Sequence, residues 1–178
     1  MRKGAVFLDR DGVLNHAPVT DGGPKSPKTM SELKILEPAI EACKQLKSMG
    51  IILIAVTNQP DIARGKVTAQ DVNAINAHVK SVLSLDDIRT CPHDNQDHCE
   101  CRKPKPGLIL DGAYDHSIDP EKSIMIGDRG SDIEAGRRAG CKTVFIDYGY
   151  PEQGPNDADF NCTNLLEAAP WVIKNLRP

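Results

Sequence analysis

The chain has 178 residues, of which 39% are hydrophobic and 26% are charged, and its formal net charge at pH 7 is -3. This length suits one domain with one sizeable core, and the small negative charge excludes the basic surface typical of nucleic-acid binding. No apolar run is long enough to span a membrane or to form a signal peptide, so we expect a cytoplasmic protein without nucleic-acid or membrane partners.

Short apolar runs alternate with helical patterns along the whole sequence. Strands are predicted at residues 5–8, 51–56, 87–91, 123–126 and 142–146. Helices are predicted at residues 38–49, 69–83, 106–114, 131–139 and 165–173, and loops at 16–28 and 147–164. This alternation favours right-handed crossovers and a three-layer α/β/α fold with a Rossmann-like parallel sheet. We expect one domain over residues 1–178, without a large cap domain.

Two carboxylates, Asp9 and Asp11, directly follow the first predicted strand. In an α/β protein the crevice at the carboxyl end of such a strand is the usual ligand site. Two acids buried there as bare charges are costly, so they imply a cation, a shared proton or a reaction. A solvated acidic turn is the alternative interpretation for an isolated Asp-x-Asp.

Polar residues also follow other predicted strands, as Thr57-Asn58, Arg102-Lys103 and Asp128. A site for phosphoryl transfer needs donors around the phosphoryl oxygens and a cation against their charge. Thr57 and Asn58 can donate hydrogen bonds to such oxygens, and Lys103 can neutralise them. Taken singly, Thr57 can also be a strand-end hydroxyl, and Asp128 an acid stabilised by a helix N-terminus.

The three acids at these strand ends can supply the nucleophile, the general acid/base and the metal ligands that such a site also needs. Asp9 can be a nucleophile, because a carboxylate can form an aspartyl-phosphate. Asp11 can protonate the leaving oxygen and later activate water. Asp9 and Asp128 can share Mg²⁺, a hard cation that prefers carboxylates and water.

The segments Phe-Leu-Asp-Arg-Asp-Gly-Val-Leu-Asn, Val-Thr-Asn-Gln, Cys-Arg-Lys-Pro and Ile-Gly-Asp-Arg resemble, in this order, the four motifs of haloacid-dehalogenase-superfamily phosphatases. The resemblance implies that Asp9 is the nucleophile and Asp11 the general acid/base. It further implies that Asp9, the backbone carbonyl of Asp11, and Asp128 hold Mg²⁺. Lys103 would be the phosphate-binding lysine, and Thr57 the hydroxyl donor.

Two residues near the fourth motif keep two interpretations each. Asp132 either supports the metal or is an acid in the first turn of a helix. Arg129 either contacts substrate or forms a surface ion pair.

A second cluster combines three cysteines and one histidine within eleven positions: Cys91, His93, Cys99 and Cys101. Three thiolates and an imidazole form a complete tetrahedral Zn²⁺ shell, which is typical of a structural ion. The alternatives are a Cys99–Cys101 or Cys91–Cys99 disulfide, free thiols, or His98 as a competing ligand. A zinc-binding loop at residues 91–103 would fix Arg102 and Lys103, which directly follow the last cysteine.

The arrangement Cys-x-His…Cys-x-Cys-Arg-Lys-Pro is similar to the branch that contains the heptose bisphosphate and histidinol-phosphate phosphatases. The resemblance implies a Mg²⁺-dependent hydrolase that removes the 7-phosphate of D-glycero-D-manno-heptose 1,7-bisphosphate for lipopolysaccharide or related glycan biosynthesis. Arg64, in Ile62-Ala63-Arg64-Gly65, can contact this substrate. Hydrolysis of histidinol phosphate or of another sugar phosphate is the second interpretation, and a zinc-stabilised binding module is the non-enzymatic one. We expect a monomer.

Overall fold

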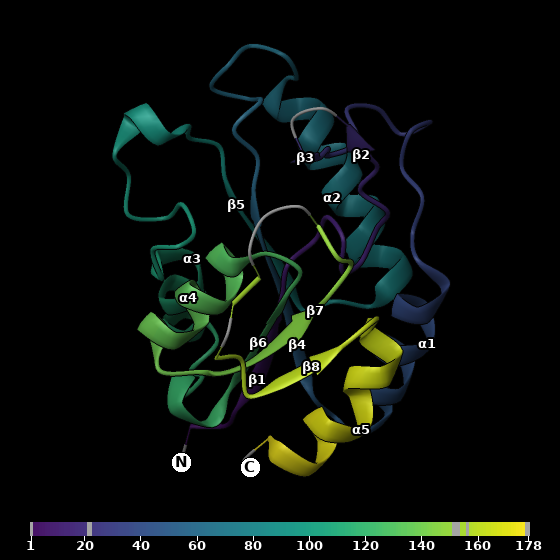
Figure 1. The fold of residues 1–178 in the computed structure, drawn as a ribbon, viewed down its shortest axis with the longest axis vertical. Coiled ribbons are helices and arrows are strands. Elements are labelled where there is room, and N and C mark those ends of the chain that lie inside the picture. Colours follow the sequence, from purple (N-terminus) through teal and green to yellow (C-terminus); the bar gives the residue numbers. More distant parts are fainter. Residues whose placement is uncertain (1, 21–22, 151–153, 156, 177–178) are drawn as a thin grey trace.

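A six-stranded parallel sheet lies between two layers of helices (Figure 1). This computed structural model describes residues 2–20, 23–150, 154–155 and 157–176. The sheet has the strand order β5-β4-β1-β6-β7-β8. Its members are β1 (Ala5–Leu8), β4 (Ile52–Asn58), β5 (Asp87–Cys91), β6 (Ile124–Gly127), β7 (Lys142–Ile146) and β8 (Phe160–Cys162).

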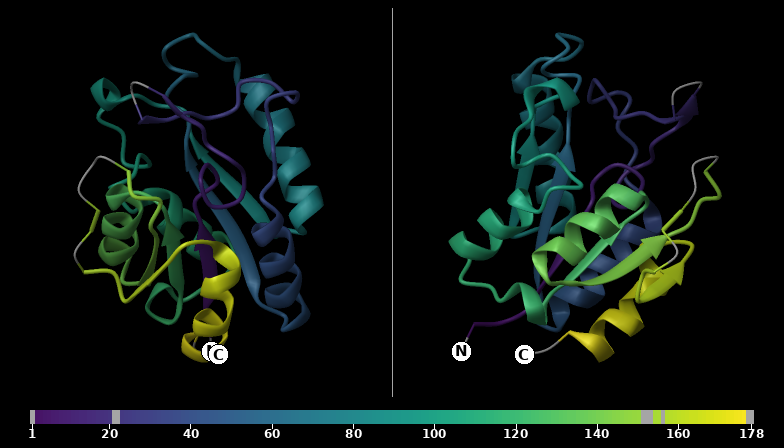
Figure 2. Two further views of the ribbon diagram at one scale, coloured as in Figure 1. Left: turned by 45° about the vertical axis from the view of Figure 1, so that its right-hand side comes forward. Right: turned by 60° about the vertical axis from the view of Figure 1, so that its left-hand side comes forward.

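Helices cover both faces of the sheet (Figure 2). Three of them share a core with one face, namely α1 (Glu37–Ser48), α2 (Ala69–Leu83) and α5 (Leu165–Asn175). The other face packs against α3 (Gly107–Asp115) and α4 (Gly130–Ala139). Two short 3-10 turns, η1 (Asn95–Asp97) and η2 (Pro120–Lys122), lie in the connections. The predicted three-layer α/β/α fold is confirmed.

Strand β1 is the centre of the sheet and has no exposed residue. Val6 and Leu8 pack into the core beneath α1, α2 and α5, while Ala5 and Phe7 pack into the core beneath α3 and α4. Successive strand residues point to opposite faces, so one apolar run supplies both cores. The position of β1 between β4 and β6 therefore brings the residues that follow it among the ends of its neighbours.

Local sequence signals account for the ends of the helices. Thr68 caps α2, and its hydroxyl accepts a hydrogen bond from the backbone N–H of Asp71 while the Asp71 carboxylate accepts one from the N–H of Thr68. This reciprocal capping satisfies two amides that a helix start leaves without partners. Gly140 ends α4 with φ of 89°, a left-handed conformation that glycine adopts without steric cost.

The structure contains three strands that the sequence pattern does not predict. Strand β8 extends the sheet within the predicted loop at 147–164, and the hairpin of β2 (Val19–Thr20) and β3 (Gly23–Pro24) lies within the predicted loop at 16–28. Strands of two or three residues are too short to show an alternation of polar and apolar positions. Residues 21–22, 151–153 and 156 of these predicted loops lie outside the described residues.

The loops after the strands lie together at one end of the molecule, the upper end in Figure 1. They comprise the hairpin β2–β3, residues 59–68 and residues 92–106. Within the described residues, the segment between β1 and α1 holds only this hairpin, and no cap domain is inserted there or after β4. Among the described residues, no helix combines the length and apolar character that crossing a membrane requires.

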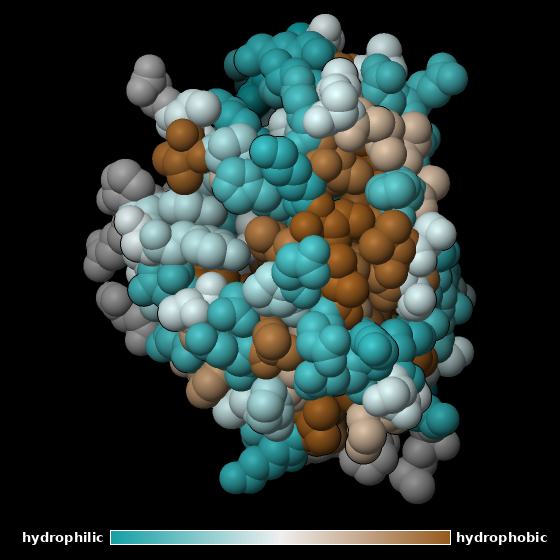
Figure 3. Space-filling model, turned by 90° about the vertical axis from the view of Figure 1, so that its right-hand side faces the viewer, coloured by the Kyte–Doolittle hydropathy of each residue, from teal (hydrophilic) through white to brown (hydrophobic). Residues whose placement is uncertain are grey.

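Hydrophobic side chains gather on the side of the molecule that carries α1 and α2 (Figure 3). Half-buried residues of α1 and of the segment before it, Leu33, Ile35, Leu36 and Ile40, pack there against the core. These side chains therefore close the core at this edge of the helical layer.

Candidate active site

Asp9 directly follows β1 and lies almost buried at the carboxyl end of the sheet. Its backbone N–H donates a hydrogen bond of 2.9 Å to the carbonyl oxygen of Ile126, which fixes the end of β1 against β6. Its Oδ1 accepts a hydrogen bond of 2.6 Å from Nζ of Lys103. The central strand thus presents a carboxylate paired with a cation from a distant part of the chain.

Lys103 is itself buried, and its ammonium has three oxygen partners. Besides Asp9, its Nζ contacts Oδ1 of Asp132 at 2.6 Å and donates to the carbonyl oxygen of Val56 at 2.8 Å. Burial alone would lower the pKa of Lys103, but the charges of Asp132 and Asp9 raise it above its ordinary value. Lys103 therefore remains a cation in this crevice and can attract a phosphoryl group.

Asp9, Asp128 and Asp132 bring three carboxylates close together, each offering an oxygen within 4.8 Å of the others. Burial raises the pKa of Asp9 to about 7 and that of Asp128 to about 8, and the charges of the neighbouring acids add to both shifts. Oδ1 of Asp128 is buried without a hydrogen-bond partner in the described structure. Carboxylate oxygens crowded in this way fit a hard divalent cation such as Mg²⁺.

Asp132 has the predicted position of an acid in the first turn of a helix, and it also forms an ion pair that was not predicted. Its Oδ2 accepts a hydrogen bond of 3.0 Å from the backbone N–H of Arg129, as expected of an acid in the first turn of α4. Its other oxygen pairs with Lys103, as described above. It is 1% exposed, so this acid is part of the buried charge cluster and not a surface residue.

Asp11 lies at the entrance of this cluster and is held by Arg10, which is fully buried. The Arg10 guanidinium contacts both oxygens of the carboxylate, at 2.9 and 3.0 Å. Asn15, Ser26 and Gln59 donate further hydrogen bonds of 2.7 to 2.9 Å. Burial alone would raise the pKa of Asp11, but Arg10 and these donors hold it below its ordinary value. Asp11 is therefore ionised at neutral pH.

A cavity of about 270 Å³ joins most of the predicted site residues. Its lining includes Asp9, Asp11, Thr57, Asn58, Arg102, Lys103, Asp128, Arg129 and Asp132. Arg64 is absent from this lining and is held elsewhere, because its guanidinium forms hydrogen bonds of 2.6 and 2.7 Å with the two oxygens of Asp94. The structure thus brings together every predicted residue of the crevice except Arg64.

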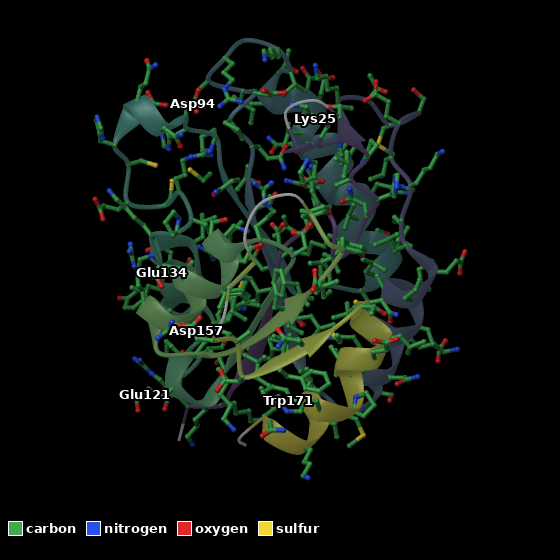
Figure 4. The ribbon with its side chains drawn as sticks, in the orientation of Figure 1. Lys25, Asp94, Glu121, Glu134, Asp157 and Trp171 are labelled. Carbon is green, nitrogen blue, oxygen red and sulfur yellow. The ribbon has the colours of Figure 1, made fainter. Side chains whose placement is uncertain are left out.

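The cysteine cluster lies beside this crevice, where yellow sulfur atoms gather below Asp94 in Figure 4. Its four residues, Cys91, His93, Cys99 and Cys101, each offer a ligand atom within 4.8 Å of the others. All three cysteines are free, so neither alternative disulfide is formed. Sγ of Cys91 lies 3.6 Å from Sγ of Cys99, and Nδ1 of His93 lies 3.3 Å from Sγ of Cys101. Sγ of Cys101 lies 2.9 Å from Sγ of Cys91 and 3.5 Å from Sγ of Cys99. Zn–S bonds of about 2.3 Å place tetrahedral ligands about 3.8 Å apart, so the ligand types and their clustering fit Zn²⁺ once Cys91 and Cys101 move slightly apart.

The loop that carries this cluster is joined to the crevice by two contacts. The Arg102 guanidinium donates to Oδ1 of Asn95 at 2.7 Å and to the carbonyl oxygen of His93 at 3.3 Å. The backbone of Lys103 exchanges two hydrogen bonds of 3.1 Å with the Asn58 side chain at the end of β4. Asn58 therefore holds the backbone of Lys103 in addition to lining the cavity.

Comparisons with known proteins place this site in a family. A HAD-hydrolase-like family model matches residues 100–168. A D-glycero-beta-D-manno-heptose-1,7-bisphosphate 7-phosphatase from Pasteurella multocida is 36% identical over 191 residues, covering 98% of this chain and 99% of the relative. The enzyme of that name from Helicobacter pylori is also 36% identical, over 94% of this chain and 96% of the relative. The chain belongs to the heptose-1,7-bisphosphate 7-phosphatase family.

A solved member of this heptose phosphatase family has the same fold. The crystal structure of a D,D-heptose 1,7-bisphosphate phosphatase from B. bronchiseptica, complexed with magnesium and phosphate, superposes with a TM-score of 0.83. It is 28% identical and the match covers 96% of this chain and 98% of that one. The predicted resemblance to haloacid-dehalogenase-superfamily phosphatases is therefore confirmed.

The structure of the present chain adds three residues to the site for which the sequence motifs predicted no role. Gln59 is 2% exposed, and its amide donates both to Asp11 and, at 2.8 Å, to Oγ1 of Thr57. Ser26 reaches Asp11 from the segment after the hairpin β2–β3. Tyr150 donates from beyond β7 to Oδ2 of Asp128 at 2.9 Å. Gln59 is the last residue of the Val-Thr-Asn-Gln motif, although no role was predicted for it, whereas no sequence spacing signals Ser26 or Tyr150.

Proposed function

We propose that the protein is a Mg²⁺-dependent phosphomonoesterase that removes the 7-phosphate of D-glycero-β-D-manno-heptose 1,7-bisphosphate. The observation that carries this proposal is the buried Asp9–Lys103 pair beside Asp128, at the carboxyl end of the central strand. Such a pair offers a nucleophile and a phosphate-binding cation at one point. The names of the relatives support the choice of the heptose substrate and of its β anomer.

The first half of the reaction uses Asp9 and Asp11. A carboxylate oxygen of Asp9 attacks phosphorus and forms an aspartyl-phosphate, while the bond between phosphorus and the sugar oxygen breaks. A proton from the Asp11 carboxyl passes to that leaving oxygen, which becomes the sugar hydroxyl. Asp11 is ionised before substrate binds. The negative phosphate raises its pKa on binding, and the carboxylate then takes from solvent the proton that it passes to the leaving oxygen.

The second half of the reaction restores the enzyme. Asp11, now ionised again, takes a proton from a water molecule that attacks the phosphorus of the aspartyl-phosphate. The bond between phosphorus and Asp9 breaks, and phosphate leaves. Lys103 and the hydroxyl of Thr57 stabilise the phosphoryl oxygens in both halves, as positioned donors do in phosphoryl transfer.

The carboxylates of Asp9 and Asp128 and the backbone carbonyl of Asp11 would hold the proposed Mg²⁺. When bound, it neutralises the charge of the phosphoryl group and of the crowded acids. Asp132 positions Lys103 through the contact of 2.6 Å. Arg102 and Arg129 line the crevice and are proposed to contact the rest of the sugar phosphate.

The proposed Zn²⁺ is structural and is held by Cys91, His93, Cys99 and Cys101. A shell of four protein ligands leaves no open position for a substrate. This ion would hold the loop that presents Arg102 and Lys103. We propose that the protein acts as a single domain and as a monomer.

The test of the substrate is phosphate release measured in parallel on three compounds with excess Mg²⁺. These are the β and α anomers of D-glycero-D-manno-heptose 1,7-bisphosphate and histidinol phosphate. We expect the highest kcat/KM on the β anomer, with heptose 1-phosphate as the product. A preference for histidinol phosphate would replace the heptose proposal, and no release from any phosphomonoester would support a binding module.

The test of the nucleophile is Asp9→Asn. An amide cannot form the acyl-phosphate, so we expect kcat to fall by about 10⁴-fold or more. Asp111→Asn, at an exposed position of α3, is the matched control and should keep full activity. Far-UV circular dichroism checks that both variants are folded. Activity of folded Asp9→Asn near that of the parent would contradict the mechanism.

A further inference from the structure

The segment after β7 carries two tyrosines that reach two different parts of the metal site. Their ring centroids lie 5.6 Å apart. The hydroxyl of Tyr150 donates to Oδ2 of Asp128 at 2.9 Å, and that of Tyr148 donates to the carbonyl oxygen of Gly12 at 2.8 Å. One short segment thus contacts both the end of β6 and the loop that follows β1.

The side chain of Asp128 has little freedom in this environment. It is 1% exposed, with one oxygen bound to Tyr150 and the other, Oδ1, buried without a partner in the described part of the chain. Gly12 has φ of 90°, and a Cβ at this position would lie 2.0 Å from Oδ2 of Asp128. Only glycine therefore leaves room for this carboxylate, and among the described residues Tyr150 supplies the hydrogen bond that fixes its rotation.

We propose that Tyr150 is a positioning residue for the magnesium site, because its hydroxyl anchors Oδ2 of Asp128 and leaves Oδ1 as the ligand oxygen. This inference rests on the proposed Mg²⁺ site and extends it to a residue outside the four motifs. Tyr150 acts through Asp128 and is not among the residues that line the crevice. Partners of this kind fix the orientation of a metal ligand, and their loss typically weakens metal affinity by about 10 to 100-fold.

The chain offers a matched pair of variants, Tyr150→Phe and Tyr148→Phe. Each removes one hydroxyl from the same segment and keeps the ring that faces the other tyrosine. Only Tyr150→Phe removes a hydrogen bond to an acid of the metal site. Mg²⁺ binding to each protein is measured by isothermal titration calorimetry, and far-UV circular dichroism checks the fold.

We expect Tyr150→Phe to raise the Kd for Mg²⁺ by about 10-fold or more and Tyr148→Phe to change it far less. In phosphate-release assays, Tyr150→Phe should need correspondingly more Mg²⁺ for half-maximal rate and recover most of kcat when Mg²⁺ is saturating. An unchanged Kd in folded Tyr150→Phe, or an equal loss in both variants, would overturn the positioning role. Absence of Mg²⁺ binding by the parent protein would instead refute the proposed metal site and this inference with it.

Discussion

At the scale of single residues, Asp11, the proposed general acid/base, is held by a neutral neighbour, Gln59. The Gln59 amide lies between Asp11 and Thr57, with hydrogen bonds of 2.7 and 2.8 Å. It is buried, so water cannot easily replace it on either partner. Because Gln59 carries no charge, its removal tests positioning without leaving a buried ion unpaired.

We predict that Gln59→Ala lowers kcat and leaves the protein folded. A hydrogen bond to a charged group contributes about 1.5 to 3 kcal/mol, which corresponds to about 10 to 100-fold in rate if it is lost in the transition state. Gln45→Ala, on the surface of α1, is the matched control and should keep the parent's rate. Steady-state phosphate release measures both, and an unchanged kcat for Gln59→Ala would show that Asp11 is positioned without it.

Some residues of the crevice could be predicted from the sequence, and others could not. Asp9, Asp11, Lys103 and Asp128 each directly follow a strand or stand in a recognisable motif, so their meeting at one edge of a parallel sheet was predictable. Ser26 contacts Asp11 only because of the course of its loop, which no periodic pattern encodes. A motif names the residues of a site, whereas their supporting contacts depend on tertiary structure.

At the scale of elements, the loop of residues 91–103 supports the crevice from outside the sheet. Its cysteine cluster, its contacts with Arg102 and the exchange between Lys103 and Asn58 form one connected structure. Among the described residues of this loop, the short turn η1 is the one helical element. A bound ion would therefore supply the order that regular hydrogen bonding does not.

We predict that the purified protein holds about one equivalent of Zn²⁺ and that Cys99→Ser reduces this content strongly. The activity of Cys99→Ser should fall by about 10-fold or more, because Arg102 and Lys103 lose their support. Cys162→Ser, at the edge of the sheet, is the matched control and should keep its zinc. Elemental analysis after gel filtration provides the measurement, and full activity of zinc-free Cys99→Ser would contradict a role of the ion in holding this loop.

The elements themselves were predictable where their patterns are long. The helix at 69–83 begins after Thr68 and ends at Leu83 as its capping residue and apolar spacing predict. Strand β8 was not predictable, since its three residues gain their place through tertiary contacts, among them the stacking of Phe160 on Trp171 of α5 at 5.5 Å. The sequence pattern thus identifies the elements that build the core, whereas the short edge strand β8 forms because of its tertiary contacts.

At the scale of the whole molecule, the carboxylate cluster links stability to pH and to metal binding. The pKa of Asp9 is raised from 3.8 to about 7 and that of Asp128 from 3.8 to about 8, mainly by burial and further by neighbouring acids, while the charge of Lys103 opposes both shifts. Between pH 3.8 and about 7 to 8 the folded metal-free protein therefore binds more protons than the unfolded chain. The contribution of these groups to the free energy of unfolding is therefore present at acidic pH and is lost as pH rises through about 7 to 8.

Mg²⁺ bound at the proposed site would compete with these protons, so we predict that its stabilising effect grows with pH. At about pH 5.5 excess Mg²⁺ should raise the Tm only slightly, because the carboxyls are protonated, whereas at about pH 8.5 it should raise the Tm markedly. Thermal unfolding followed by circular dichroism, with and without Mg²⁺ at both pH values, provides the measurement. Asp128→Asn removes one ligand and its proton, so its Mg²⁺-dependent shift should be small at both pH values. A shift in the parent protein that is equal at both pH values, or larger at the acidic one, would show that Mg²⁺ binds outside this carboxylate cluster.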